Sequence, residues 1–293
     1  MSSKQRKIIT RLSSRFEALA QRVQSASQQK YEKTIPTLPR TASQRGKANL
    51  EAISILSTKT GATITKKERE ALKKYTGWGG FSSVGKWNKQ IKDPQFIATK
   101  NAITNEYYTP YTLTYSIHQQ IHPIIHSKIK DLLPVPKYKG EFLMLEPSAG
   151  IGRFIDPMYA EGYNWNAVEP SPQSAKILMA LYPKVNTSVM KFEEWAQVQN
   201  PTAIYSAIIA NPPYKARTTE TKLLDPDWVD YIRAETYQFL RILPMLNKGG
   251  ICVMMIPRKT MSSKDKAVAE IREDILKQAH IIDAYRLPNT ARS

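Results

Sequence analysis

Ala207-Ile208-Ile209-Ala210-Asn211-Pro212-Pro213-Tyr214 is the stretch of the sequence that decides the fold. Its apolar half, 207–210, predicts a strand buried on both faces, which is typical of a parallel sheet. The two prolines end that strand, because they fix φ and cannot donate backbone hydrogen bonds. The tetrapeptide 211–214 is therefore expected at the carboxyl end of the strand, where open α/β sheets bind their ligands.

The chemistry of this tetrapeptide suits a planar substrate that bears an amine. The amide oxygen of Asn211 and the carbonyl oxygen of Pro212 are two acceptors for the two amine hydrogens. The ring of Tyr214 offers a face on which such a substrate can stack. The prolines stiffen the backbone that holds these groups.

Strands and helices alternate from about residue 140 onward. The expected strands are 142–146, 166–169, 187–190, 206–210, 251–256 and 280–286. The expected helices include 171–181, 228–246 and 265–278, with a further helix after the first strand. Strands separated by helices predict an α/β fold with a doubly wound, mostly parallel sheet.

The turn after the first strand is rich in small residues, which let a ligand approach the backbone closely. Its candidate binding residues are Pro147, Ser148, Ala149, Gly150 and Gly152. The turn is neither G-x-G-x-x-G nor a Walker sequence, so no phosphate cradle is indicated. Acids end the first and second strands at Glu146 and Glu169. An acid at the end of the second strand is typical of a site that binds ribose hydroxyls.

These motifs, in this order, resemble those of S-adenosylmethionine-dependent DNA adenine-N6 methyltransferases of the gamma order. The resemblance covers roughly residues 105–288 and includes Tyr107-Tyr108-Thr109-Pro110, which resembles the family's motif upstream of the first strand. It implies a Rossmann-like class I methyltransferase sheet and S-adenosylmethionine as the cofactor. It further implies that Tyr107, Thr109, Pro110 and Glu146 surround the methionine end of the cofactor, and that Glu169 binds its ribose.

The resemblance also implies the roles of the remaining candidate residues. Asn211, Pro212, Pro213 and Tyr214 are the catalytic tetrapeptide, with Asn211 also facing the cofactor. Family members often have an Asp before the Phe that follows the third strand; here Lys191-Phe192-Glu193 stands instead. Phe192 is therefore expected to pack on the cofactor adenine, with Glu193 as a weak substitute for the usual polar contact.

The mechanism expected from these roles relies on positioning rather than on a strong base. Asn211 Oδ1 and the Pro212 carbonyl would accept the N6 hydrogens and direct the nitrogen lone pair at the sulfonium methyl. The target adenine must leave the duplex, or come from a single strand, to stack on Tyr214. Residues 215–228, with Lys215, Arg217 and Lys222, are expected to form a basic loop over the substrate or an ordinary solvated loop.

The charge of the chain favours a nucleic acid partner. Lys and Arg number 43 against 25 Asp and Glu, a net charge of +18, which suits a polyanion. Residues 1–50 contain 11 basic and 2 acidic residues, so 11 − 2 = +9. We expect a basic, mainly helical region at 1–100, with 1–50 as an arm, helices at about 8–23, 44–57 and 66–74, and a methyltransferase domain at 101–293.

Tyr75-Thr76-Gly77-Trp78-Gly79-Gly80-Phe81 predicts a tight turn that presents aromatic side chains. It resembles a box upstream of the methylase region in large phage and plasmid methylase–helicase proteins, which favours a mobile-element origin. The alternative is a turn that packs Trp78 under the sheet.

Several other features limit the possible functions. Cys252 is the only cysteine, so no intramolecular disulfide is possible, and its apolar surroundings predict a buried thiol. His118, His122 and His126 are spaced by four residues, as in some metal-binding helices. Pro123 is expected to break their helix, and no H-E-x-x-H pattern accompanies them. No metal site is therefore predicted. No signal peptide and no 18-residue apolar stretch is present, so a cytoplasmic, nucleoid-associated protein without a membrane partner is expected.

Three other functions remain open from the sequence: an RNA adenine methyltransferase, a protein glutamine-N5 methyltransferase, and a non-enzymatic DNA-binding anti-restriction protein.

Five residues follow the expected sixth strand and Pro288, too few for a hairpin and a seventh strand. We therefore expect either a truncated chain that lacks its last strand or a partner segment that completes the sheet edge. A protein partner is also an expected source of specificity. Sequence specificity is expected to be low, which would suit protection of mobile-element DNA from restriction.

Overall fold

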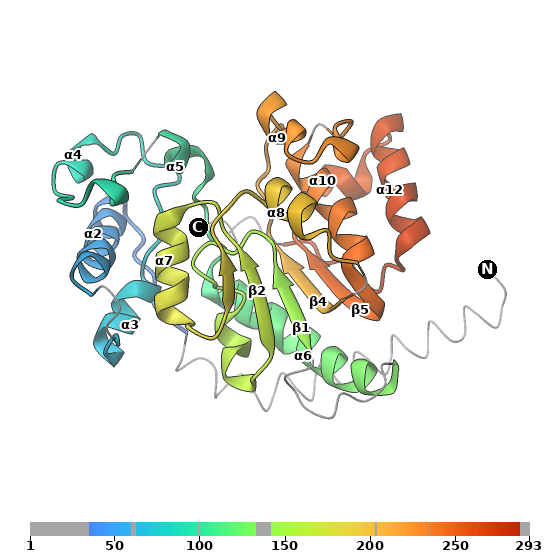
Figure 1. Ribbon diagram of the computed structural model, residues 1–293, viewed down its shortest axis with the longest axis horizontal. Helices are drawn as coiled ribbons and strands as arrows, with labels where there is room; N and C mark the ends of the chain where they lie inside the picture. The colour runs from blue at the N-terminus through green and yellow to red at the C-terminus, as the bar shows by residue number, and fades with distance from the viewer. Residues whose placement is uncertain are drawn as a thin grey trace.

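The computed structural model describes residues 35–59, 63–98, 100–132, 142–202, 204–231 and 233–287; the helix expected at 8–23 lies outside them. A five-stranded sheet in the order β3-β2-β1-β4-β5 forms the centre of this part of the chain (Figure 1). The strands are β1 (Leu143–Glu146), β2 (Asn164–Val168), β3 (Asn186–Ser188), β4 (Tyr205–Ala210) and β5 (Leu246–Met254). Every neighbouring pair is parallel. The predicted Rossmann-like, doubly wound α/β fold is confirmed.

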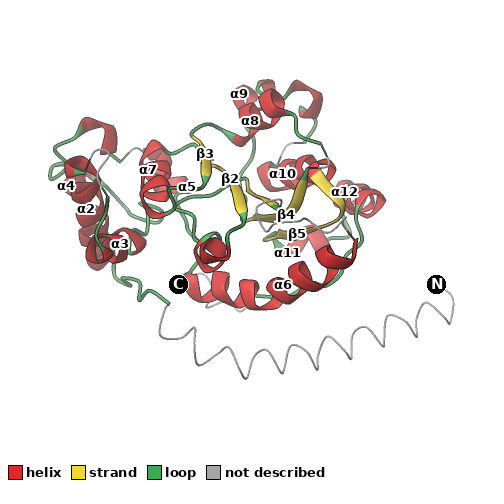
Figure 2. Cartoon of the chain, turned by 60° about the horizontal axis from the view of Figure 1, so that its bottom comes forward, coloured by secondary structure: helices red, strands yellow, loops and turns green. Residues whose placement is uncertain are grey.

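Helices cover both faces of the sheet (Figures 1 and 2). The first part of the chain forms α2 (Ala42–Thr58), α3 (Lys66–Lys73), α4 (Gly85–Asn88), η1 (Pro94–Phe96), α5 (Lys100–Asn105) and α6 (Tyr111–Leu132). Between the strands lie η3 (Asp156–Glu161), α7 (Pro172–Leu181), α8 (Phe192–Gln199), α9 (Thr219–Leu223), η4 (Pro226–Trp228), α10 (Ala234–Ile242) and η5 (Leu243–Met245). After β5 come α11 (Arg258–Ser262) and α12 (Lys266–Gln278).

Alternate residues of the central strands β1 and β4 enter two different hydrophobic cores, because successive side chains of a strand point to opposite faces. Met144 of β1 and Ile209 of β4 belong to the core under α6 and α7. Leu145 of β1 and Ile208 of β4 belong to the core under α8 and α10. The β4 strand is buried along its whole length, as its uninterrupted apolar sequence predicts.

The described N-terminal helices pack onto the sheet domain through α7, which α2 and α3 both contact. Capping boxes begin α2 at Thr41 and α3 at Thr65, each with a Gln or Glu three residues later. A smaller core of this region is built around Trp78, Phe81 and Trp87. The turn that contains Trp78 is thus packed inside the N-terminal region.

Several predicted elements are wrong in extent or type. The helix expected at 228–246 is only 234–242, flanked by short 3₁₀ turns, and the segment after β1 forms the 3₁₀ helix η3. The α6 helix continues through Pro123, although a break was expected there. The β5 strand begins at Leu246, before the glycines that were expected to precede it, with a register irregularity opposite 205–207.

The sixth strand expected at 280–286 is absent. These residues are exposed and irregular, and no described strand pairs with the outer edge of β5. Their apolar sequence favours a strand, but a strand also needs a neighbour for its backbone hydrogen bonds. Ile281, Ile282 and Tyr285 are consequently 49%, 57% and 69% exposed.

None of the helices formed by the described residues combines the length and apolar character that are needed to cross a bilayer. Cys252 lies in β5 as a free cysteine that is half-buried rather than fully buried as expected, and desolvation of its thiol raises the pKa to about 12. A thiol with so high a pKa is a poor nucleophile, in agreement with the structural role expected for it.

Candidate active site

The carboxyl ends of the strands bring the predicted site residues together. Glu146 ends β1, Glu169 directly follows β2, and Asn211 directly follows β4. The strand order reverses between β1 and β4, and open α/β sheets bind ligands in the crevice at such a point. Glu169, Asn211 and residues of the turn after β1 line one open cleft at this edge.

The Glu169 carboxylate is nearly buried and is held by the backbone. Its Oε2 accepts a hydrogen bond from Gly150 N at 2.7 Å, and its Oε1 accepts one from Ser171 N at 2.8 Å. Burial raises the pKa of this carboxyl to about 7, against the lowering effect of the two backbone hydrogen bonds. Each oxygen keeps a lone pair that can accept a further hydrogen bond.

The Glu146 carboxyl lies deeper, at 1% exposure. Burial, reinforced by the negative charge of Glu169, raises its pKa well above the ordinary value. Its Oε2 has no hydrogen-bond partner among the described residues. The Glu146 side chain borders a cavity of about 30 Å³, which Thr109, Ser148 and Asn211 also line. A buried carboxyl with an unused oxygen fits a site for a donor group of a ligand.

The Asn211 side chain is fixed by two neighbours. Its Nδ2 donates to Thr109 Oγ1 at 2.9 Å, so that Oδ1 is left as the acceptor on the other side. The Tyr214 hydroxyl donates to Asn211 Oδ1 at 2.6 Å and also contacts the Met255 carbonyl oxygen at 3.1 Å. Thr109, predicted as a cofactor residue, therefore orients the predicted catalytic amide.

The other residues of the upstream motif differ in their exposure. Tyr107 lines the cleft, is 61% exposed and lies beside Gly79 and Gly80. The Tyr108 ring is half-buried beside Tyr75, with its hydroxyl 2.5 Å from Ser174 Oγ. Pro110 immediately precedes α6, a position that suits a residue without a backbone donor.

Close packing explains the glycines of the turn after β1. Gly150 has φ of 55°, and a Cβ there would lie 2.6 Å from the Tyr108 ring. Gly152 has φ of 80°, and a Cβ there would lie 2.8 Å from the Tyr182 ring. Both positions require glycine because of their positive φ and their close neighbours.

Phe192 lies at the start of α8, where it is mostly buried and stacks on Trp195 with ring centroids 5.9 Å apart. It also lines the cleft. Glu193, the weak substitute for the family's Asp, pairs with Arg217 at 3.7 Å. Its carboxylate is thus engaged within the protein.

Glu106 and Arg153 are two buried residues that shape this site and that sequence reasoning missed. Glu106 Oε2 accepts from the Tyr75 hydroxyl at 3.1 Å and from Trp78 N at 3.2 Å, and its Oε1 accepts from Ser171 Oγ. Arg153 donates to the carbonyl oxygens of Tyr75 at 2.8 Å and Thr109 at 3.0 Å. A charged residue inside the apolar run after Gly152 is the signal that could have identified Arg153.

The turn 75–81 packs directly against the residues that precede Tyr107. Gly79 N donates to the Glu106 carbonyl oxygen at 3.1 Å, and a Cβ on Gly79 would lie 2.3 Å from that oxygen. From α2, Arg45 donates to the Gly79 carbonyl at 2.7 Å and Asn49 donates to the Gly77 carbonyl at 2.8 Å. The N-terminal region therefore contacts the segment 106–107, which lines the cleft, through this turn.

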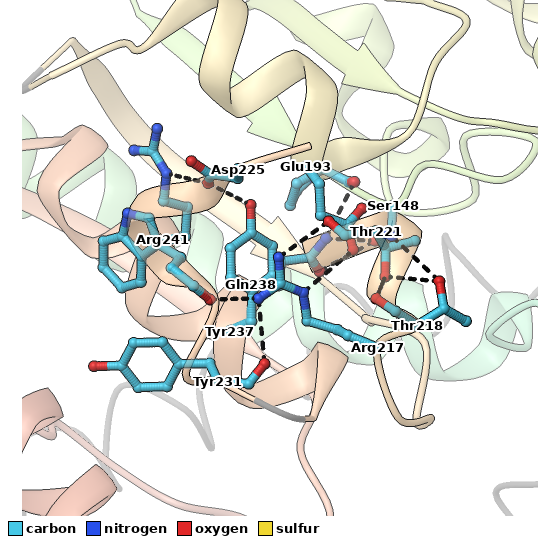
Figure 3. A network of polar contacts seen from close by, with 12 residues as sticks. Ser148, Glu193, Arg217, Thr218, Thr221, Asp225, Tyr231, Tyr237, Gln238 and Arg241 are labelled. Carbon is cyan, nitrogen blue, oxygen red and sulfur yellow. Dashed lines mark hydrogen bonds and ion pairs between the residues drawn. The ribbon is translucent and has the colours of Figure 1, made fainter. Parts of the chain in front are cut away.

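The segment 215–231 is anchored by Arg217, which was expected on a basic loop facing substrate. That expectation is wrong for Arg217: it is buried, lies 3.7 Å above the Tyr237 ring and donates to the Trp228 carbonyl oxygen at 2.6 Å (Figure 3). Lys215 remains exposed. A buried guanidinium can satisfy several carbonyl oxygens at once, so Arg217 holds the loop together.

The same network reaches the turn after β1 (Figure 3). Gln238 of α10 donates to Ser148 Oγ at 2.9 Å and to the Pro147 carbonyl at 3.3 Å. Asp225, fully buried, pairs with Arg241 at 2.9 Å and accepts from the Tyr237 hydroxyl at 2.7 Å. No sequence signal marked Gln238, since a helical Gln is usually solvated.

Comparisons with known proteins agree with this architecture. Residues 173–292 match the family described as Eco57I restriction-modification methylase. The chain is 26% identical over 245 residues to Defense against restriction protein B of Escherichia phage P1, and the matched region covers 83% of this chain and 9% of that protein. The chain thus spans less than a tenth of that relative's length.

Two solved structures are similar at low identity. One is described as a class I S-adenosylmethionine-dependent methyltransferase from Listeria monocytogenes, at 12% identity and a TM-score of 0.49, covering 78% of this chain and 70% of that one. The other is a TehB-like methyltransferase from Corynebacterium glutamicum, at 11% identity and a TM-score of 0.31, covering 57% of this chain and 82% of that one.

The matched segment 173–292 includes β3, β4 and β5 and the tetrapeptide 211–214. The buried acids at the ends of β1 and β2 suit a donor-rich cofactor at this edge. The chain thus combines a Rossmann-like α/β sheet with a segment, 173–292, that is similar to a restriction-modification methylase family.

Proposed function

We propose that the protein transfers a methyl group from S-adenosylmethionine to N6 of adenine in DNA. The observation that supports this best is the placement of Asn211: its amide is oriented by Thr109, directly after β4, at the same edge as Glu146 and Glu169. An amide acceptor and a proline carbonyl beside a cofactor site suit a planar amine better than an alcohol or a thiol.

The cofactor side of the site would be built from the two buried acids and the turn between them. Glu169 would accept from the ribose hydroxyls, and the unused oxygen of Glu146 would accept from the amino group of the methionine end. The backbone of 147–152 would lie against the cofactor, with Phe192 at its adenine. The bound cofactor supplies an electrophilic methyl group.

The substrate side would be built from 211–214. Asn211 Oδ1 and the Pro212 carbonyl would each accept one N6 hydrogen, which favours a pyramidal amine and directs its lone pair at the methyl group. The Tyr214 hydroxyl, which occupies Asn211 Oδ1 in this structure, would yield to the incoming amine. Its ring, 46% exposed, would then stack on an adenine that has left the duplex.

DNA as the substrate is supported by charge and by the relatives. The net charge of +18 suits a polyanion, and the exposed Lys215 and Arg258 line the same cleft. Contacts from Lys and Arg arms go mainly to phosphates, so we propose low sequence specificity. The name of the phage P1 relative suggests protection of mobile-element DNA from restriction as the biological role.

Parallel methylation assays test the proposal. The protein is incubated with tritiated S-adenosylmethionine and with duplex DNA, RNA or a protein mixture, and labelled nucleosides or amino acids are then separated. The proposal predicts label in N6-methyladenine from DNA. Label confined to RNA or to glutamine would mean that RNA or protein, rather than DNA, is the substrate. The absence of transfer alongside measurable cofactor binding would favour a non-enzymatic role.

A further inference from the structure

His118, His122 and Glu161 form a cluster of potential metal ligands away from the methyltransferase cleft. Glu161 ends η3, three residues before β2 begins, so the cluster lies at the amino end of this strand. Asn211 and Glu169 lie at the carboxyl ends of parallel strands. The cluster therefore lies at the amino-terminal ends of the strands, opposite the carboxyl ends that carry the proposed catalytic site, and is not part of that site.

The α6 helix supplies the two imidazoles. Since α6 continues through Pro123, His118 and His122 remain at i and i+4 on one helix face. Their ring centroids are 4.9 Å apart. Two histidines at this helical spacing are the arrangement with which metalloprotease helices bind zinc.

The ligand atoms have the spacing of a metal site. His118 Nε2 lies 3.2 Å from Glu161 Oε1, and His122 Nε2 contacts Glu161 Oε2. One ligand atom from each residue lies within 4.8 Å of the others. Zinc bonds of about 2.0–2.2 Å in a tetrahedron place ligand atoms about 3.3 Å apart. Small side-chain rotations would thus bring all three onto one ion.

We propose that His118, His122 and Glu161 bind one zinc ion, with solvent as the fourth ligand. Two imidazoles and a carboxylate, with water in the fourth position, are a ligand set with which proteins bind zinc. His118 is buried, whereas the His122 and Glu161 side chains are 30% and 20% exposed. An ion can therefore enter from the solvent side. Binding would fasten α6, whose first turn follows Thr109 and Pro110, to the segment between β1 and β2.

Metal titrations on the full chain test this site. After treatment with a chelator and dialysis, the protein should bind one equivalent of Zn²⁺ by calorimetry, and Co²⁺ should produce the intense visible absorption of a four-coordinate site. The melting temperature should rise with free Zn²⁺, as expected for a ligand that binds the folded state.

Two variants and one matched control decide the assignment. His122→Ala should abolish stoichiometric binding, and Glu161→Gln should weaken it at least tenfold. His280→Ala, which removes a histidine outside the cluster, should bind Zn²⁺ as the wild type does. Circular dichroism checks that each variant is folded. Equal Zn²⁺ binding by wild type and His122→Ala, or no binding by the folded wild type, would show that the cluster is only a hydrogen-bonded contact between α6 and η3.

Discussion

Glu169 has an unusual environment for a carboxyl group, since it is both buried and held by two backbone donors. Replacement by Ala is expected to remove charge-assisted hydrogen bonds to the cofactor, which contribute about 1.5–3 kcal/mol. The dissociation constant of S-adenosylmethionine should therefore rise about 10- to 150-fold. Calorimetry measures this, with Glu194→Ala, an exposed acid on α8, as the control. Unchanged affinity in Glu169→Ala would remove Glu169 from the cofactor site.

The raised pKa of Glu169 gives cofactor binding a defined pH dependence. The cofactor-free protein holds the Glu169 proton up to about pH 7, whereas the ionised form is the better acceptor for ribose hydroxyls. Binding should therefore release a proton, and affinity should be about tenfold higher at pH 8 than at pH 6. Calorimetry in buffers of different ionisation enthalpy measures both effects. In Glu169→Gln the part of the pH dependence due to this group should disappear; its persistence would assign the proton to another group, such as Glu146.

The raised pKa of Glu169 affects the stability of the fold in the opposite direction: cofactor affinity rises with pH, whereas this contribution to stability falls with pH. The folded, cofactor-free protein binds this proton more tightly than the unfolded chain, whose Glu pKa is near 4.5. The contribution of Glu169 to the free energy of unfolding is therefore greatest below about pH 4.5 and falls as the pH rises to about 7.

At the scale of elements, the turn 75–81 links the N-terminal helices to the upstream motif. Gly79→Ala would place a Cβ 2.3 Å from the Glu106 carbonyl oxygen, so the turn must move away from Tyr107. We expect a lower melting temperature and weaker binding of S-adenosylmethionine. Gly85→Ala is the matched control, because its Cβ would meet only Ser83 Oγ, at 3.7 Å. Equal effects of the two substitutions would mean that the turn does not position the cofactor side of the cleft.

The elements also show how far the sequence could predict the fold. Strands β1, β2 and β4 and helix α7 were placed within two residues, because buried apolar runs and a Ser-Pro helix start are local signals. Glu146, Glu169 and Asn211 were predicted to lie together because the carboxyl ends of parallel strands meet on one side of the sheet.

The elements that could not be predicted depend on tertiary partners. The α6 helix tolerates Pro123 because the rest of the helix is stabilised by packing on the sheet, including Ile121 in the core. The segment 280–287 has the composition of a strand but no described neighbour. The burial of Arg217 depends on carbonyl oxygens of 221–231, which no local pattern reveals.

At the scale of the whole molecule, positive charge is concentrated toward the N-terminus. Residues 1–34 contain 8 Lys and Arg and 2 Glu, and they precede Arg45 and Asn49, which hold the turn 75–81. Replacing these eight basic residues by Gln should weaken DNA binding and flatten its salt dependence. The slope of log K against log salt should become shallower by about 0.9 for every phosphate that the variant no longer neutralises. An unchanged slope would exclude this segment from DNA binding.

The proposed low sequence specificity likewise concerns the whole molecule. Sequencing of DNA methylated by the protein should find modified adenines in many contexts, because phosphate contacts do not distinguish bases. Modification confined to one motif of about four or more base pairs would require direct major-groove readout. The proposal of low specificity would then be wrong, whereas the proposed reaction would stand.

The most direct test of the account compares Asn211→Ala with the wild type on the same DNA. Formation of N6-methyladenine is measured from tritiated S-adenosylmethionine, and cofactor affinity is measured on the same preparations. Because Asn211 is proposed to act on the amine in the transition state, the variant should bind S-adenosylmethionine nearly normally and lose almost all methyl transfer. Transfer to adenine N6 by the variant at more than about a tenth of the wild-type rate, a loss of about 1.4 kcal/mol or less, would contradict the proposed role of the tetrapeptide 211–214.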